Sequence, residues 1–266
     1  MRVRESLPNT SPWAAHLIPT PIHHVLSTIR AGGTRTLLMG GQACVFYGAA
    51  QVSKDVDFVI LADQANLASL RQALDLLNAE RIAVPPFDAD ALNRGHAVHF
   101  RCRCPQANGL RIDVMSSLRG MPSFEVLWTR RTVVRHHSGE DFDLLCVPDL
   151  VAAKKTQRSK DWPVIELLVD IHYEENKERP TLDFIRFWLL EARSPEQLAQ
   201  LAARFPSEAA DCSVRRPLLG IAVSGDLRRL RVELFEEMAI EQEKDRVYWE
   251  PLKKELEEWR KREAGA

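Results

Sequence analysis

The stretch GGQACVFYGAAQVSKDVDFVI, residues 40–60, constrains the fold of this chain more than any other. Two glycines end the short apolar run 37–39, and two aspartates open the next apolar run. Glycine has no Cβ, so it allows a tight turn and a close approach of a ligand to the backbone. Residues 42–50 carry apolar side chains at helical spacing. The stretch therefore predicts a strand, a Gly-Gly turn, a helix and a second strand over 52–61.

In the rest of the chain, predicted strands and helices are mixed up to about residue 147, and only helices are predicted after it. Strictly alternating residues predict a hairpin of two strands, 97–104 and 110–115. Further helices are expected over 21–30, 65–80, 148–158, 162–175, 181–191, 195–205, 226–246 and 251–262, and further strands over 34–39, 132–135 and 141–147. Pro251 is expected to open the last helix, because proline fits the first helical turn.

These patterns together predict an α/β (α+β) fold, in which a mixed β-sheet core is flanked by helices and followed by an all-helical C-terminal part. We expect three parts: an N-terminal arm over 1–20, a core over 21–175 and a helical region over 176–266.

Composition limits the classes of partner. Lys and Arg number 36 and Asp and Glu 37, so the formal net charge of −1 gives no general attraction to nucleic acid. The chain has five cysteines, and we find no N-terminal signal-type segment and no run of the ~20 apolar residues that a membrane helix needs. We expect a soluble, cytoplasmic protein with no membrane partner.

Three aspartates predict a metal site. Residues two apart in a strand point the same way, so Asp55 and Asp57 share one face of their strand. Asp113 lies on the polar face of the later hairpin, and the three converge if the two strands are neighbours. Clustered carboxylates repel one another and are tolerated mainly around a cation. Hard oxygen ligands of this kind favour Mg²⁺ or Mn²⁺, completed by substrate phosphates.

The glycine pair predicts a place for those phosphates. Gly40, Gly41 and Gln42 lie where a strand ends and a helix begins, and the free N–H groups of a helix start suit a phosphate. The pattern differs from a Walker loop, which needs Gly-Lys-Ser/Thr, and from the G-x-G-x-x-G dinucleotide fingerprint.

Residues 34–168 resemble the polymerase-β-like nucleotidyltransferase superfamily, whose pattern is Gly-Gly or Gly-Ser, about ten residues, Asp-x-Asp, and a third carboxylate downstream. Residues 40–60, with Lys54 before the acidic pair, look most like the abortive-infection (AbiEii-type) toxins and their bacterial relatives. The resemblance extends into VPDLVAAKKTQRSKD, residues 147–161. It implies a nucleotidyltransferase core in residues 21–175.

The resemblance also implies a reaction and roles. A nucleoside triphosphate such as ATP would transfer its nucleotidyl group to a hydroxyl acceptor and release pyrophosphate. Lys154 would touch the phosphates with support from Asp161, although Lys155 competes for that role. The acceptor would be a tRNA 3′ end, a protein side chain or a small molecule. The alternative is a catalytically silent nucleotide-binding or partner-binding module of a toxin–antitoxin pair, with an antitoxin-type protein as its partner.

Other chemistry-bearing residues have simpler interpretations. Asp141 and Asp143 repeat the Asp-x-Asp spacing without a preceding glycine pair, so we interpret them as a solvated edge. Cys102 and Cys104 share a face with apolar residues and are expected to be buried. His99 lacks a partner at ligand spacing and is expected to be structural. Arg101, Arg103 and Arg111 share a polar strand face that could meet RNA phosphates.

Overall fold

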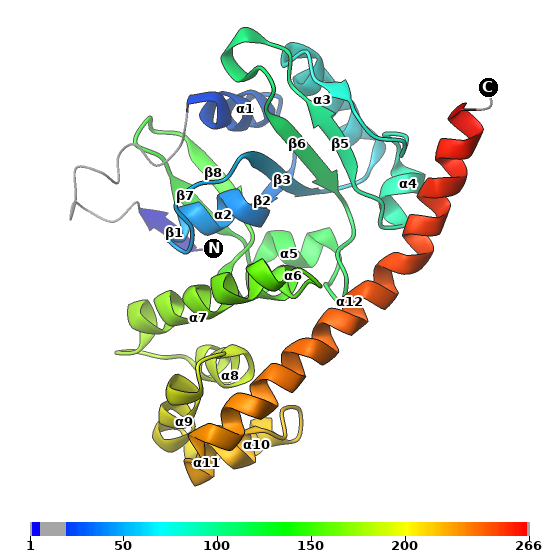
Figure 1. Cartoon of the computed structure of the whole chain (residues 1–266). Helices are drawn as coiled ribbons and strands as arrows, with labels where there is room; N and C mark the ends of the chain where they lie inside the picture. Colours follow the sequence, from blue (N-terminus) through cyan, green and yellow to red (C-terminus); the bar gives the residue numbers. More distant parts are fainter. Residues whose placement is uncertain (1, 6–19, 265–266) are drawn as a thin grey trace. The chain divides into compact units, whose positions relative to one another are not determined.

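A computed structural model describes residues 2–5 and 20–264 of the chain (Figure 1). Residues 6–19 of the predicted N-terminal arm lie outside the described residues, and residues 2–5 form a strand. Contacts divide the chain into two compact units. The first contains the residues up to Ala153 and those from Trp249 onward, and the second contains Lys154–Tyr248.

The first unit is built on a mixed sheet with the strand order β1-β7-β8-β2-β3-β6-β5-β4. The strands are β1 (Arg2–Glu5), β2 (Thr36–Met39), β3 (Asp55–Ile60), β4 (Glu80–Arg81), β5 (Val98–Arg101), β6 (Arg111–Met115), β7 (Thr132–Arg135) and β8 (Asp141–Leu144). The pairs β1–β7, β2–β8 and β3–β6 are parallel, and the other neighbouring pairs are antiparallel. The predicted hairpin of β5 and β6 and the mixed sheet are confirmed.

Helices flank this sheet. They are α1 (Thr20–Ala31), α2 (Gly40–Phe46), α3 (Gln64–Leu76), α4 (Ala89–Asn93), α5 (Phe124–Thr129) and α6 (Val147–Lys154), with the short 3₁₀ turn η2 (Pro105–Ala107). In Figure 1, α1 and α3 lie side by side, and they contact each other directly. Leu26 of α1 and the strand residues Leu38 and Phe58 line one small pocket, so α1 covers the face of the sheet on which Phe58 lies.

The second unit is helical, as the C-terminal patterns predict. It contains η3 (Ser159–Asp161), α7 (Trp162–Asn176), α8 (Leu182–Glu191), α9 (Pro195–Arg204), α10 (Pro206–Ser213), α11 (Leu219–Ser224) and part of α12 (Leu227–Ala264). Trp188 of α8 is fully buried and donates a hydrogen bond from its indole nitrogen to Nδ1 of His172 at 2.9 Å. A buried tryptophan supplies a large apolar area and still needs a partner for its N–H, which the histidine provides.

The prediction that Pro251 opens a separate last helix is wrong. A single helix, α12, runs through Pro251 from Leu227 to Ala264. A proline in a helix interior removes one backbone hydrogen bond and costs about 3 kcal/mol, so its neighbours must favour the helix. Strong helix formers surround it, and the ion pair between Lys254 and Glu250 spans the proline on the helix surface at 3.0 Å.

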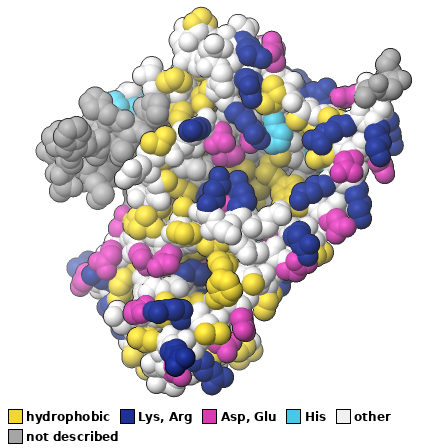
Figure 2. Space-filling model, viewed as in Figure 1, with side chains coloured by type: hydrophobic (Ala, Val, Ile, Leu, Met, Phe, Trp, Pro, Cys, Tyr) yellow, Lys and Arg dark blue, Asp and Glu magenta, His cyan; other side chains and the backbone are white. Residues whose placement is uncertain are grey.

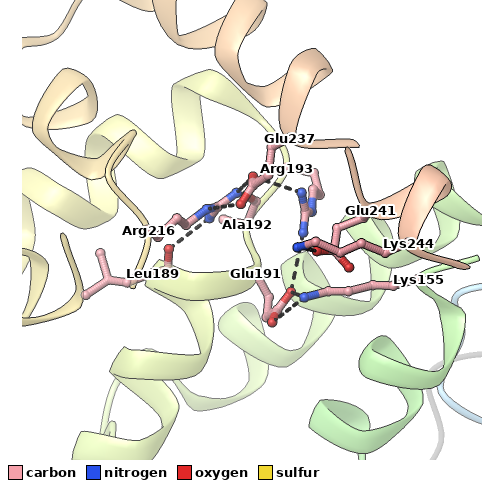
Figure 3. Close-up of polar contacts among 9 residues, drawn as sticks. All are labelled: Lys155, Leu189, Glu191, Ala192, Arg193, Arg216, Glu237, Glu241 and Lys244. Carbon is pink, nitrogen blue, oxygen red and sulfur yellow. Dashed lines mark hydrogen bonds and ion pairs between the residues drawn. The ribbon is translucent and has the colours of Figure 1, made fainter. Parts of the chain in front are cut away.

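A buried polar network ties the helices of the second unit together (Figure 3). Arg216 is 3% exposed and donates to the main-chain oxygens of Leu189 and Ala192 at 2.8 and 2.9 Å. It also binds Glu237 of α12 through Nη2 at 2.8 Å, and Arg193 approaches the same carboxylate at 3.0 Å. Arg216 therefore joins the end of α8 to the first third of α12.

The hydropathy of the helices agrees with the composition. Within the part of the chain that the structure describes, we find no helix that combines the length and the apolar character required to cross a membrane.

Candidate functional site

The register of β3 and β6 brings the predicted acidic residues to neighbouring positions. The two strands pair in parallel, with Asp57 opposite Asp113 and Asp55 opposite Arg111. Val56 and Ile112, which alternate with these residues, are fully buried. The three carboxylates therefore lie on the half-exposed face of the sheet, opposite the face that α1 covers. The condition on which the predicted cluster depends, that the two strands are neighbours, is confirmed.

Each glycine of the pair lies close to another side chain. Near the first glycine this is one of the aspartates, and near the second it is a residue that contacts an aspartate. Gly40 has a φ of +66°, and a Cβ built on it would lie 1.9 Å from Oδ2 of Asp57. A Cβ on Gly41 would lie 2.7 Å from Oγ of Ser53, and that hydroxyl donates to Oδ1 of Asp55 at 3.2 Å. The turn after β2 and the acidic strand β3 are thus fitted to each other without side chains at positions 40 and 41.

Asp113 is held by a basic partner from its own strand. Nε of Arg111 donates to Oδ1 of Asp113 at 2.6 Å, and Nδ1 of His99 lies 2.8 Å from the same oxygen. The same Nδ1 lies 2.9 Å from Nη2 of Arg111. A protonated Nδ1 donates to the carboxylate and an unprotonated one accepts from the guanidinium, so one nitrogen cannot make both bonds. The bond from Arg111 to Asp113 does not depend on the tautomer.

These contacts set the charge of the site. Burial raises the pKa of Asp113, but hydrogen bonds and charges from His99 and Arg111 outweigh it and hold that pKa below its usual value. The hydrogen bond to Asp113 raises the pKa of Arg111, and the charges of Asp55 and Asp57 add to the effect. One guanidinium is therefore close enough to interact with all three carboxylates.

The sequence prediction did not include Arg111 or His99 in the site. The signal was present, because alternation places both on the polar face of the hairpin and the register sets His99 directly opposite Asp113. His99 was expected to be structural, but it directly contacts a candidate site residue. Arg103, expected on the RNA-facing surface, pairs with Glu80 at 2.8 Å. Figure 2 shows acidic side chains bordered by basic ones and a histidine where β5 and β6 lie.

The donor set fits a divalent ion in chemistry and in backbone placement. Three carboxylates from adjacent strands supply hard oxygen ligands, and the missing Cβ of Gly40 leaves space for the carboxylate of Asp57. Within the described residues, no three His, Cys, Asp or Glu side chains already form a group that could hold a metal. An ion held by Asp113 would compete with the hydrogen bond that Arg111 donates to its Oδ1.

Gln42, predicted to bind phosphate, lies in the first turn of α2. It is fully buried, and neither Nε2 nor Oε1 has a hydrogen-bond partner among the described residues. An unpaired buried amide costs about 1–3 kcal/mol. The structure thus places Gln42 beside the glycine pair but away from solvent, and its phosphate role remains a prediction.

We expect Gln42→Met to raise the free energy of unfolding by about 1 kcal/mol, because it removes two unpaired polar atoms while keeping the side-chain length. Urea denaturation measures the change. Asn66 is the matched control, since its buried amide donates to the main-chain oxygens of Arg35 and Leu61. Asn66→Leu should destabilise by about 2 kcal/mol. A loss of stability in Gln42→Met would show that its amide is satisfied in solution.

Lys154 and Asp161 contact each other in the second unit. Nζ of Lys154 lies 3.2 Å from Oδ1 of Asp161, and both residues are buried. Burial raises the pKa of Asp161. The hydrogen bond from the hydroxyl of Thr156 and the charges of Lys154 and Arg158 lower it by more, so the pKa lies below its usual value. Lys155 pairs instead with Glu191 at 2.6 Å. Asp161 thus orients Lys154, whereas the contact of Lys154 with phosphate remains a prediction.

The second Asp-x-Asp pair lies inside the sheet, so its interpretation as an edge is wrong. β8 pairs with β7 on one side and with β2 on the other. Asp143 binds Arg131 at 2.5 Å and Asp141 binds Arg135 at 2.8 Å. Sheet order depends on long-range pairing, which the local pattern did not predict. The expected burial of Cys102 and Cys104 is confirmed.

Comparison with known proteins finds no family model that matches the chain and no match among the curated proteins. The functional interpretation therefore depends on the residues and their geometry.

Proposed function

We propose that this chain is a metal-dependent nucleotidyltransferase, which transfers a nucleoside monophosphate from a nucleoside triphosphate to a hydroxyl acceptor and releases pyrophosphate. One observation supports the proposal most strongly. Asp55, Asp57 and Asp113 share a face of two paired strands, and the glycine turn after β2 closes against Asp57. A Cβ at Gly40 would meet Oδ2, Cγ and Cβ of Asp57 within 2.8 Å, so the turn and the acidic strand are closely fitted at that position.

The residues have distinct roles in this proposal. Asp55 and Asp57 would hold a Mg²⁺ or Mn²⁺ ion, and Asp113 would help to position a second ion and accept the proton of the attacking hydroxyl. When bound, two such ions would together stabilise the attacking and leaving oxygens. The backbone at Gly40 and Gly41 lies against the phosphates, and Lys154, oriented by Asp161, neutralises the departing pyrophosphate. Such transfers depend on positioning and electrostatics.

The acceptor is a tRNA 3′ end, a protein side chain or a small molecule. The second candidate, a silent nucleotide-binding or partner-binding module of a toxin–antitoxin pair, is favoured by one observation. Asp113 is engaged by Arg111 and His99, and an engaged carboxylate does not accept a proton until those contacts change.

The test is transfer of label from each of the four α-³²P nucleoside triphosphates, with Mg²⁺ or Mn²⁺, into total RNA or into the proteins and small molecules of a cell lysate. We expect one acceptor class to become labelled and Asp55→Asn to reduce labelling about 100-fold, the usual cost of losing one preorganised electrostatic group. Asp141→Asn is the matched control, because it changes the second Asp-x-Asp pair and should leave labelling intact.

The possible results separate the two candidates. Labelling that survives in Asp55→Asn would contradict the site. Nucleotide binding without labelling of RNA, protein or small molecules would favour the silent module.

A further inference from the structure

The position of Arg111 suggests a role that the three aspartates alone do not explain. Arg111 lies opposite Asp55 in the β3–β6 register and two residues before Asp113 on the same face. Its Nε donates to Oδ1 of Asp113, whereas its side chain is 41% exposed. The guanidinium therefore contacts Asp113 through Nε and lies 2.9 Å from Nδ1 of His99 through Nη2, while part of its side chain faces solvent.

Three carboxylates share this guanidinium. Its hydrogen bond to Asp113 and the charges of Asp55, Asp57 and Asp113 raise the pKa of Arg111. Like-charged carboxylates on one face repel one another unless a cation lies between them. Arg111 supplies part of that neutralisation from within the chain.

A divalent cation would compete with Arg111. Both need the carboxylate of Asp113, where Arg111 already engages Oδ1, and two cations a few ångströms apart repel each other.

We propose that Arg111 is a built-in counter-ion of the carboxylate site, which occupies Asp113 until a divalent ion displaces it and then binds the phosphates of the nucleotide. This inference rests on the proposed function, since it specifies how that site takes up its metal and its substrate. A displaced guanidinium presents a planar set of donors that suits phosphate oxygens. Metal and nucleotide therefore bind cooperatively, because each removes the other's competitor for Asp113 and Arg111.

The experiment measures binding of Mn²⁺ alone by electron paramagnetic resonance, with and without a nucleoside triphosphate analogue that cannot be cleaved between the α- and β-phosphates. We expect Arg111→Met to bind Mn²⁺ about tenfold more tightly than the unchanged chain without nucleotide. The analogue should tighten Mn²⁺ binding about tenfold in the unchanged chain and much less in the variant.

Matched variants give the controls. Arg135→Met removes an arginine that binds Asp141 of the second Asp-x-Asp pair, from Nε at 2.8 Å and from Nη2 at 3.0 Å. It should leave Mn²⁺ binding unchanged. Should Arg111→Met fail to fold, as judged by circular dichroism, Arg111→Lys keeps the charge without the Nε contact. It should bind Mn²⁺ more tightly than the unchanged chain.

The results distinguish this inference from the proposed function. Suppose that Asp55→Asn abolishes Mn²⁺ binding, but that Arg111→Met binds Mn²⁺ no more tightly than the unchanged chain. This result would overturn the counter-ion role of Arg111 and keep the metal site. Absence of Mn²⁺ binding in the unchanged chain and in every Arg111 variant would overturn both.

Discussion

Gly40→Ala is expected to lower the free energy of unfolding by about 4 kcal/mol. Two costs combine. An alanine at a φ of +66° is strained, and its Cβ would lie 1.9 Å from Oδ2 of Asp57, so the carboxylate or the turn must move. Cγ and Cβ of Asp57 would also lie only 2.5 and 2.8 Å from that Cβ, so rotation of the carboxylate alone does not relieve the contact. Urea denaturation measures the loss.

Gly33→Ala separates the two costs. Gly33 has a nearly identical φ of +68°, but a Cβ there would meet nothing within 4 Å. Its substitution should cost about 1 kcal/mol, the strain alone. The difference between the two variants is the cost of the close approach to Asp57. If both variants lose the same stability, Asp57 moves aside without cost, and the fitted turn is not a constraint on the site.

The faces of the strands could be predicted from the sequence because alternation is a local property. Asp55 and Asp57 on one side and Val56 and Phe58 on the other follow from the strand period of two, and burial agrees. The helical second unit likewise follows from periodicity. The parallel pairing of β3 with β6 required the assumption that the strands are neighbours, since residues so far apart in sequence reveal no register.

What the sequence could not predict depends on choices between long-range partners. Arg111 interacts with three carboxylates, and the alternation along the strands does not show that Asp113 is the one to which it donates a hydrogen bond. β8 was expected at an edge and lies between β7 and β2, because strand order is decided by the whole sheet. Pro251 predicted a helix start, yet the surrounding residues stabilise α12 through it. In each case tertiary context outweighed a local preference.

Arg216 is expected to be the residue on which the second unit depends most. Arg216→Met should lower the free energy of unfolding by about 3–5 kcal/mol, the usual cost of removing one partner of a buried charge network. The variant would leave the main-chain oxygens of Leu189 and Ala192 without their donor. Glu237 would also keep only one of its two arginine partners, Arg193.

The cause can be located by hydrogen exchange together with two further variants. Exchange should accelerate at the end of α8, where Arg216 binds the last carbonyl groups. Arg216→Lys keeps the charge but cannot reproduce several fixed bonds with one ammonium group, so it should recover only part of the loss. Arg231→Met is the control, because Arg231 is 70% exposed and binds Glu196 at 2.9 Å, a surface pair worth about 0.5 kcal/mol. If Arg231→Met proves as costly as Arg216→Met, loss of positive charge in general rather than the buried network explains the effect, and the link between α8 and α12 contributes little.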